Sequence, residues 1–182
     1  MTMQEDTIKL LKKEFFARRN GVLADAMRRN GDPHAFIMGC MLSDIIEVTA
    51  QFAPNAELAR ALWADCAHRE CRLAAPMLFP RDEMTDEEAR CWALDVQTEE
   101  EADVLCHRLL RHLPCASPIA LALIDNDAPL VAYTGWRLMA NLLAVTADPL
   151  PPVLQTKAQA ALSTPSTSVP LRDLLMRLTN NE

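Results

Sequence analysis

Two helix-start signals follow one another in the middle of the chain, and they restrict its fold more than any other feature. Thr85 stands three residues before Glu88, and Thr98 stands three residues before Glu101. At this spacing the Thr hydroxyl accepts a hydrogen bond from a free amide of the first helical turn, and the Glu side chain reaches back to the helix start. The sequence therefore predicts two consecutive helices that begin at these threonines.

The second of these helices has the clearest amphipathic pattern in the chain. Its apolar residues recur at intervals of three and four, which places them on one helical face: Ala102, Leu105, Cys106, Leu109, Leu110 and Leu113. Caps, glycines and prolines divide the rest of the sequence into similar segments. We expect helices over 4–18, 22–30, 34–52, 57–79 (with or without a kink near 66–68), 85–96, 98–113, 118–125, 129–145, 153–163 and 171–178.

The composition favours helices over strands. Of the 182 residues, 50% are hydrophobic, only 5% are aromatic and four are glycine. The length suits one domain with a continuous core, so we expect a single all-α domain over 1–182. The helices pair at intervals of about 35 to 45 residues, which is typical of HEAT-like antiparallel helical repeats that form a curved α-α superhelix. An irregular helical bundle is the alternative.

The sequence excludes several classes of protein. No apolar stretch approaches the roughly 20 residues of a membrane-spanning helix, and the N-terminal stretch 1–16 lacks the apolar core of a signal peptide. We expect a soluble, cytoplasmic protein without membrane association and without a cofactor. Glycine-rich phosphate loops, HExxH, GxSxG and Cys-His nucleophile patterns are absent, which argues against the common hydrolases and nucleotide-binding enzymes.

The cysteines have no metal-binding spacing. None of the six is in a CxxC pair, so we interpret them as small apolar core residues in a reducing compartment. A zinc site could be built from Cys106, His107, His112 and Cys115, but the two histidines point to other faces of their helix than Cys106. We therefore expect no metal site, with core cysteines and surface histidines instead.

Charge is distributed unevenly along the chain. The formal net charge is −7, yet residues 1–31 contain seven Lys or Arg against four acids, and residues 81–103 contain ten acids against two Arg. Because nucleic-acid affinity comes largely from neutralised phosphates, the acidic block should repel DNA unless it faces away from it.

Two groups of residues have both a functional and a structural interpretation. The acid run at 99–101, with Asp103, is dense enough for general-base or charge-stabilising work, but acids also favour the first turn of any helix. Trp63, Trp92 and Trp136 could line a base-binding cleft, although tryptophans beside aliphatic residues usually belong to a core.

The stretch LWADCAHRECRLAAPMLF resembles the DNA alkylation repair family, the HEAT-like AlkD-type glycosylases. The resemblance rests on the following residues and extends over the helix order from about 20 to 145: Leu62, Trp63, Glu70, Arg72, Ala74 and Ala75. It implies a HEAT-like fold and contact with duplex DNA.

The resemblance also implies an eroded catalytic segment at residues 99–103. Family members have Trp-Asp-x-x-Asp there, whereas Glu99 replaces the Trp, Glu100 stands at the catalytic Asp and Asp103 keeps the second acid. The family's phosphate-binding Arg falls near Tyr133, with Arg137 one turn further on. The expected catalytic residues are therefore Glu100 and Asp103. The expected DNA-binding residues are Arg69, Arg72, Arg108, Arg111, Arg137, Tyr133 and Trp63, together with the basic segment 9–29.

Two functions follow from this reading. The first is a divergent HEAT-like member of the DNA alkylation repair superfamily with weakened or lost base excision and residual DNA binding. If it is an enzyme, it is of the DNA-3-alkylpurine glycosylase type. The alternative is a helical-repeat scaffold whose concave face binds a protein partner.

Overall fold

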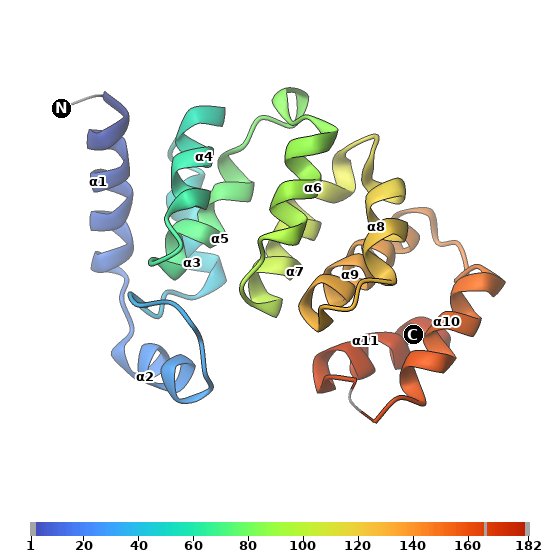
Figure 1. Cartoon of the computed structure of the whole chain (residues 1–182). Helices are drawn as coiled ribbons and strands as arrows, with labels where there is room; N and C mark the ends of the chain where they lie inside the picture. Colours follow the sequence, from blue (N-terminus) through green and yellow to red (C-terminus); the bar gives the residue numbers. More distant parts are fainter. Residues whose placement is uncertain (1–2, 166, 181–182) are drawn as a thin grey trace. The chain divides into compact units, whose positions relative to one another are not determined.

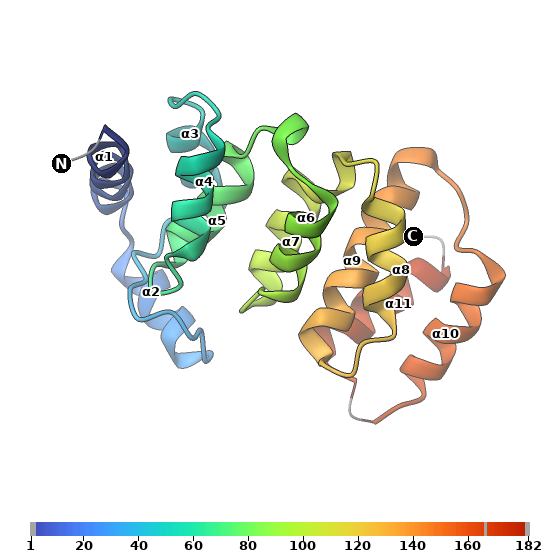
Figure 2. The same cartoon turned by 45° about the horizontal axis from the view of Figure 1, so that its top comes forward.

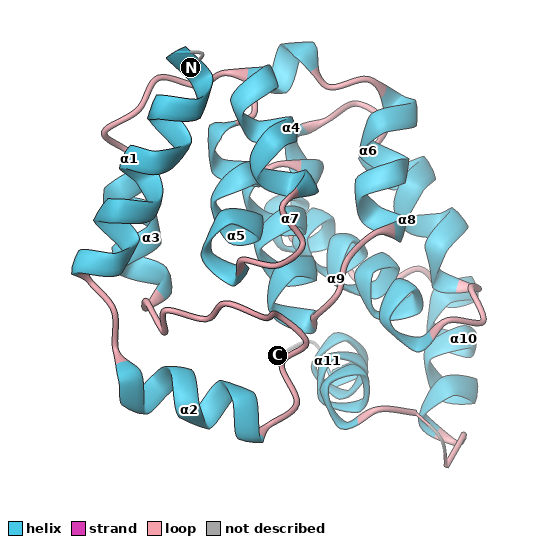
Figure 3. Cartoon of the chain, turned by 60° about the vertical axis from the view of Figure 1, so that its left-hand side comes forward, coloured by secondary structure: helices cyan, strands magenta, loops and turns pink. Residues whose placement is uncertain are grey.

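The computed structural model describes residues 3–165 and 167–180, and this part of the chain is helical. Figure 3 shows helices joined by loops, with no strand among the described residues. The only extended pairing found there is an isolated bridge between Phe36 and His68. The predicted all-α fold is confirmed.

The helices are short and follow one another closely along the chain (Figure 1). Their bounds are α1 (Met3–Ala17), α2 (Gly21–Arg29), α3 (Leu42–Thr49), α4 (Ala56–Ala64), α5 (Arg69–Leu78), α6 (Asp86–Leu94), α7 (Glu99–Arg108), α8 (Ala116–Ile124), α9 (Pro129–Thr146), α10 (Pro152–Leu162) and α11 (Val169–Asn180). Two 3₁₀ turns, η1 (Arg81–Glu83) and η2 (Leu110–His112), follow α5 and α7.

The chain divides into two compact units, Met1–Met84 and Thr85–Glu182. In the first unit α4 packs against α5, α3 packs against α5, and α1 contacts α3 and α4. Its core includes the fully buried Leu11, Phe15, Ile45, Leu62 and Leu73. That the whole chain is one domain stays a prediction.

Helix α9 is the centre of the second unit. It packs against α8 and α7 and also contacts α11, which in turn packs against α10 (Figure 2). Helices α8 and α9 approach so closely at Gly135 that an added Cβ would lie 2.7 Å from the backbone nitrogen of Ile124. Side chains of α7, η2 and α9 fill the interior, among them the fully buried Leu105, Leu110 and Leu138.

Both helix starts predicted from the Thr and Glu pairs are confirmed. The hydroxyl of Thr85 accepts a hydrogen bond from the amide of Glu88, and that of Thr98 from the amide of Glu101, each at 3.1 Å. The buried Glu101 carboxylate accepts from the amide of Gln97 at 2.9 Å. Glu101 is therefore committed to the cap of α7.

The segment 57–79, predicted as one helix with or without a kink near 66–68, forms two separate helices, α4 and α5, with a break at 65–68. The break at 65–68 is held by contacts that are distant in sequence. The Phe36 amide donates to the Ala67 carbonyl at 2.8 Å, and the Arg69 amide donates to the Phe36 carbonyl at 3.2 Å. The Asp65 carboxylate also lies 2.7 Å from Lys12 Nζ and 2.8 Å from His68 Nδ1.

The segment 34–52 contains a loop before its helix, so the helix predicted there is too long. Helix α3 begins only at Leu42 because the Glu70 carboxylate accepts hydrogen bonds from the amides of Met38, Gly39 and Cys40, which holds this stretch out of helical geometry. Gly39 has φ of +75°, and a Cβ there would lie 2.2 Å from the Asn20 carbonyl oxygen.

Two large apolar side chains of this segment lie at the surface. Phe36 is 56% exposed and Met41 59% exposed. The expectation that all cysteines are core residues is wrong for Cys66 and Cys91, which are exposed, whereas the other four are buried.

No helix in the described part of the chain is both long enough and apolar enough to cross a membrane. Within residues 3–165 and 167–180, no group of three or more His, Cys, Asp and Glu side chains is arranged to hold a metal ion.

Candidate nucleic-acid interface

Three of the residues singled out in the sequence meet in the second unit, between α7 and α9. The Tyr133 hydroxyl donates a hydrogen bond to Asp103 Oδ1 at 2.7 Å. Arg137 lies one turn after Tyr133 on α9, and its Nε is 2.9 Å from the same oxygen. Because residues four apart lie on the same side of a helix, both side chains of α9 reach the one carboxylate of α7.

The surroundings of the Asp103 carboxylate shift its pKa in both directions. Burial raises the pKa of Asp103, the Tyr133 hydrogen bond and the Arg137 charge lower it, and Glu100 and Glu99 raise it, so that the net pKa is above its ordinary value. Burial and the hydrogen bond to Asp103 also raise the pKa of Tyr133. Tyr133 therefore stays a neutral donor to Asp103.

The three acids at 99–101 differ in their exposure to solvent. Glu99 is exposed, Glu100 is half-buried in the first turn of α7, and Glu101 is the buried capping residue. Glu100 acts on Asp103 as a like charge one turn away. The expected catalytic pair, Glu100 and Asp103, therefore lies on one helix.

A basic cluster is centred on His107 of α7 and consists of Arg108 of α7, Arg111 of η2 and Arg137 of α9, the last of which also pairs with Asp103. Partial burial lowers the pKa of His107, and the charges of Arg111, Arg108 and Arg137 lower it further. Arg111 Nε also donates to His112 Nε2 at 3.2 Å. The charges of the three arginines thus all act on one imidazole. A group of arginines like this one can neutralise the phosphate charges of DNA.

The structure contradicts the expectation that Arg69 and Arg72 contact DNA. They are 1% and 0% exposed. Arg69 donates to the Cys40 carbonyl at 3.2 Å and to Glu70 Oε1 at 2.9 Å. Arg72 donates to the Trp63 carbonyl at 2.6 Å, and its guanidinium lies 3.7 Å from the centre of a Trp63 ring. Neither guanidinium can reach a phosphate, because both are enclosed by their own unit.

The tryptophans are core residues. Trp63 and Trp92 are each 5% exposed and Trp136 is 2% exposed. This matches the structural interpretation of these residues and leaves no exposed indole for a base-binding cleft. Trp63, expected as a DNA contact, is instead the platform on which Arg72 lies.

Several basic side chains of the segment 9–29 pair with acids of their own unit. Lys12 pairs with Asp65, Arg18 with Glu14 and Arg28 with Asp25, at 2.7, 2.7 and 2.9 Å. Of these pairs, only Lys12–Asp65 uses an acid outside residues 1–31, so it alone reduces the excess positive charge of this segment. Exposed basic side chains such as Lys13 and Arg29 remain at its surface.

The helical arrangement defines the class of protein: this is a HEAT-like repeat fold. No protein-family profile matches the sequence, and no curated protein matches it either. A solved structure described as "a new family of proteins related to the HEAT-like repeat DNA glycosylases with affinity for branched DNA structures" superposes with a TM-score of 0.76, at 16% identity over 92% of this chain and 72% of that one. The predicted HEAT-like fold is thereby confirmed.

Proposed function

We propose that this chain is a DNA-binding protein of the HEAT-like glycosylase-related fold, with weakened or lost base excision. The observation that carries the proposal is the group of basic side chains Arg108, Arg111 and Arg137, whose charges act on His107 and of which Arg137 also pairs with Asp103. The affinity of the similar structure for branched DNA supports DNA as the ligand, and branched DNA as the preferred form.

The weakened excision follows from the state of the candidate catalytic groups. A carboxylate that stabilises the cationic sugar of an excision transition state must be ionised and directed at the substrate. Asp103 instead accepts a hydrogen bond from Tyr133 and pairs with Arg137, so its Oδ1 is engaged within the protein and not directed at a substrate. Glu100 is the remaining acid at the family's catalytic position, and Glu99 stands where the family has its tryptophan.

Fluorescence anisotropy with labelled duplex and four-way-junction DNA tests the binding. We expect binding of both at about 50 mM salt, with tighter binding of the junction. Arg108→Ala and Arg111→Ala should weaken both complexes. Arg90→Ala is the matched control, because it removes one exposed positive charge from α6 of the same unit.

An assay of the release of alkylated purines from duplex DNA tests the proposed weakening or loss of base excision. We expect a rate near that of the uncatalysed loss. A clear release that Glu100→Gln abolishes would instead identify an active glycosylase, with Glu100 as its carboxylate.

A protein-binding scaffold is the second candidate, and a specific observation favours it. The first unit exposes six large apolar side chains over residues 10–42: Leu10, Phe16, Val22, Phe36, Met41 and Leu42. Absence of any DNA binding near 50 mM salt would favour this function over the first.

A further inference from the structure

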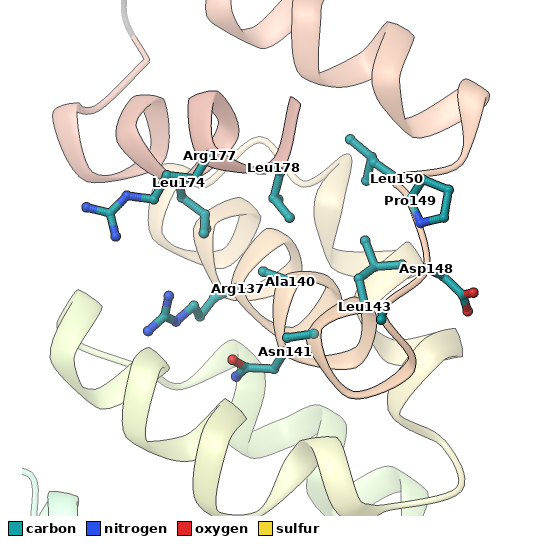
Figure 4. A pocket seen from close by; sticks show the side chains of 12 residues that line it. Arg137, Ala140, Asn141, Leu143, Asp148, Pro149, Leu150, Leu174, Arg177 and Leu178 are labelled. Atoms are coloured by element: carbon teal, nitrogen blue, oxygen red, sulfur yellow. The ribbon is translucent and has the colours of Figure 1, made fainter. Parts of the chain in front are cut away.

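The second unit contains a cavity of about 590 Å³ between α9, α11 and the loop that follows α9. This volume is in the range of small-molecule and nucleotide sites. Figure 4 shows that Arg137 and Arg177 extend toward one end of it, with Asn141 beside Arg137, and that Asp148 lies at the opposite end. Nothing in the sequence pattern pointed to this cavity, because its wall combines residues of α9 with others more than thirty positions away.

The cationic end has polar groups that lack partners among the described residues. The Nδ2 atom of Asn141 is buried and makes no hydrogen bond. Arg137 Nε lies near Asp103 but is not directed along a hydrogen bond to it. Arg177 is exposed and forms no ion pair with another described residue. Arg177 and a buried amide are therefore available to an anionic ligand, and Arg137, which pairs with Asp103 through Nε, adds a second positive charge at this end.

The remainder of the cavity suits a largely apolar group. Its walls are mostly aliphatic, including Leu143, Leu150, Leu174 and Leu178. None of the described residues that line it is aromatic. The Asp148 carboxylate, far from the arginines, can accept a hydrogen bond from an amino group.

We propose that this cavity binds one unpaired nucleotide of DNA, with the phosphate at Arg137 and Arg177 and the base between the leucines. The groups of a nucleotide complement those of the cavity in order. Its phosphate matches the arginines, its apolar base faces match the leucines, and its hydrogen-bonding base edge matches Asp148 at the other end. A paired base cannot enter without the cost of unstacking, which is least at a bulge or a branch point. The inference rests on the proposed DNA binding and explains how an unpaired site is distinguished from duplex.

The test uses the full chain and a duplex with a single bulged 2-aminopurine. Because the cavity has no aromatic wall to quench it, the probe should become several-fold brighter when it leaves the DNA stack and enters the cavity. Binding should be tighter to bulged than to fully paired DNA. Arg177→Ala and Asn141→Leu should each reduce that preference about tenfold, the value of one charge-assisted or buried hydrogen bond. Binding to paired DNA should be retained.

Lys157→Ala is the matched control, since it removes a positive charge of the same unit whose partner is Asp125 outside the cavity. Equal affinity for bulged and paired DNA, with no change in fluorescence, would overturn the nucleotide site and leave the proposed function intact. Failure to bind either DNA would refute the proposed function itself. Binding of free dAMP in the absence of DNA binding, weakened by Arg177→Ala, would overturn DNA as the source of the nucleotide.

Discussion

Among single residues, Glu70 has the most demanding structural role in the first unit. Its buried carboxylate accepts from three consecutive amides and from Arg69. An ionised carboxylate is costly to bury unless its oxygens are fully hydrogen-bonded, and here they are. Glu70 thereby links the start of α5 to the loop that precedes α3.

Glu70→Gln should destabilise the protein by about 3 kcal/mol, because it leaves the Arg69 charge buried without its counter-charge. Urea unfolding followed by circular dichroism measures this. Glu47→Gln, an exposed site on α3, should change stability by less than about 0.5 kcal/mol. Equal effects of the two substitutions would contradict this role of Glu70.

Asp103 should contribute to folding stability with the opposite pH dependence to that of most carboxylates. Its raised pKa means that the folded state binds a proton at higher pH than the unfolded state does. Stability therefore falls as pH rises from the usual Asp pKa, about 3.9, through the raised value. Asp103→Asn keeps an acceptor for the Tyr133 hydroxyl and removes the ionisable group, and with it this fall in stability.

The melting temperature of Asp103→Asn should exceed that of the wild type at pH 7, by the equivalent of about 1 kcal/mol or less because the side chain is partly exposed. The two should converge below about pH 4. Thermal unfolding between pH 3.5 and 7 checks this. A wild type that is more stable at pH 7 would show that the Arg137 ion pair outweighs burial.

The limits of sequence-based prediction are clearest for Arg69 and Arg72. Helical spacing placed them away from the apolar stripe, and a charged residue off the stripe is normally solvated. Their partners, Glu70, the Cys40 carbonyl and Trp63, come into reach only after the chain folds. The family resemblance indicates Asp103, Tyr133 and Arg137 one by one, and only the structure shows that they meet.

Among the helices, short-range sequence signals predict where α6 and α7 begin, whereas contacts between distant residues determine where the chain breaks between α4 and α5. The Thr caps of α6 and α7 act within one turn, so the sequence contains them completely. The break at 65–68 depends on Phe36 and Lys12, which are far away in sequence. Ser117 followed by Pro118 is a pattern typical of a helix cap, yet Ser117 lies inside α8, which begins at Ala116.

Thr98→Ala should therefore lower stability by about 1 kcal/mol, since the Glu101 amide loses its acceptor. Ser117→Ala is the matched control: it removes the same kind of hydroxyl from a site without a cap hydrogen bond and should be nearly neutral. Chemical unfolding of both variants compares them. A loss at Ser117 as large as that at Thr98 would contradict the assignment of the caps.

For the whole molecule, overall charge and local charge predict different behaviour toward DNA. A net charge of −7 predicts repulsion, whereas the basic cluster concentrates three arginine charges around His107. If these neutralise about three phosphates, affinity should fall roughly 40-fold between 50 and 200 mM salt. Anisotropy titrations at both salt concentrations measure the slope, and an affinity independent of salt would exclude the cluster as the contact.

The hydrogen bond between Tyr133 and Asp103 also has a practical consequence. Tyr133 is the one tyrosine of the 182 residues. Protein grown with fluorotyrosine would therefore give a single ¹⁹F resonance, from a ring that contacts the carboxylate and lies one turn before Arg137. Occupancy and protonation of the interface can thus be followed by one spectroscopic line, without mutation and without an attached dye.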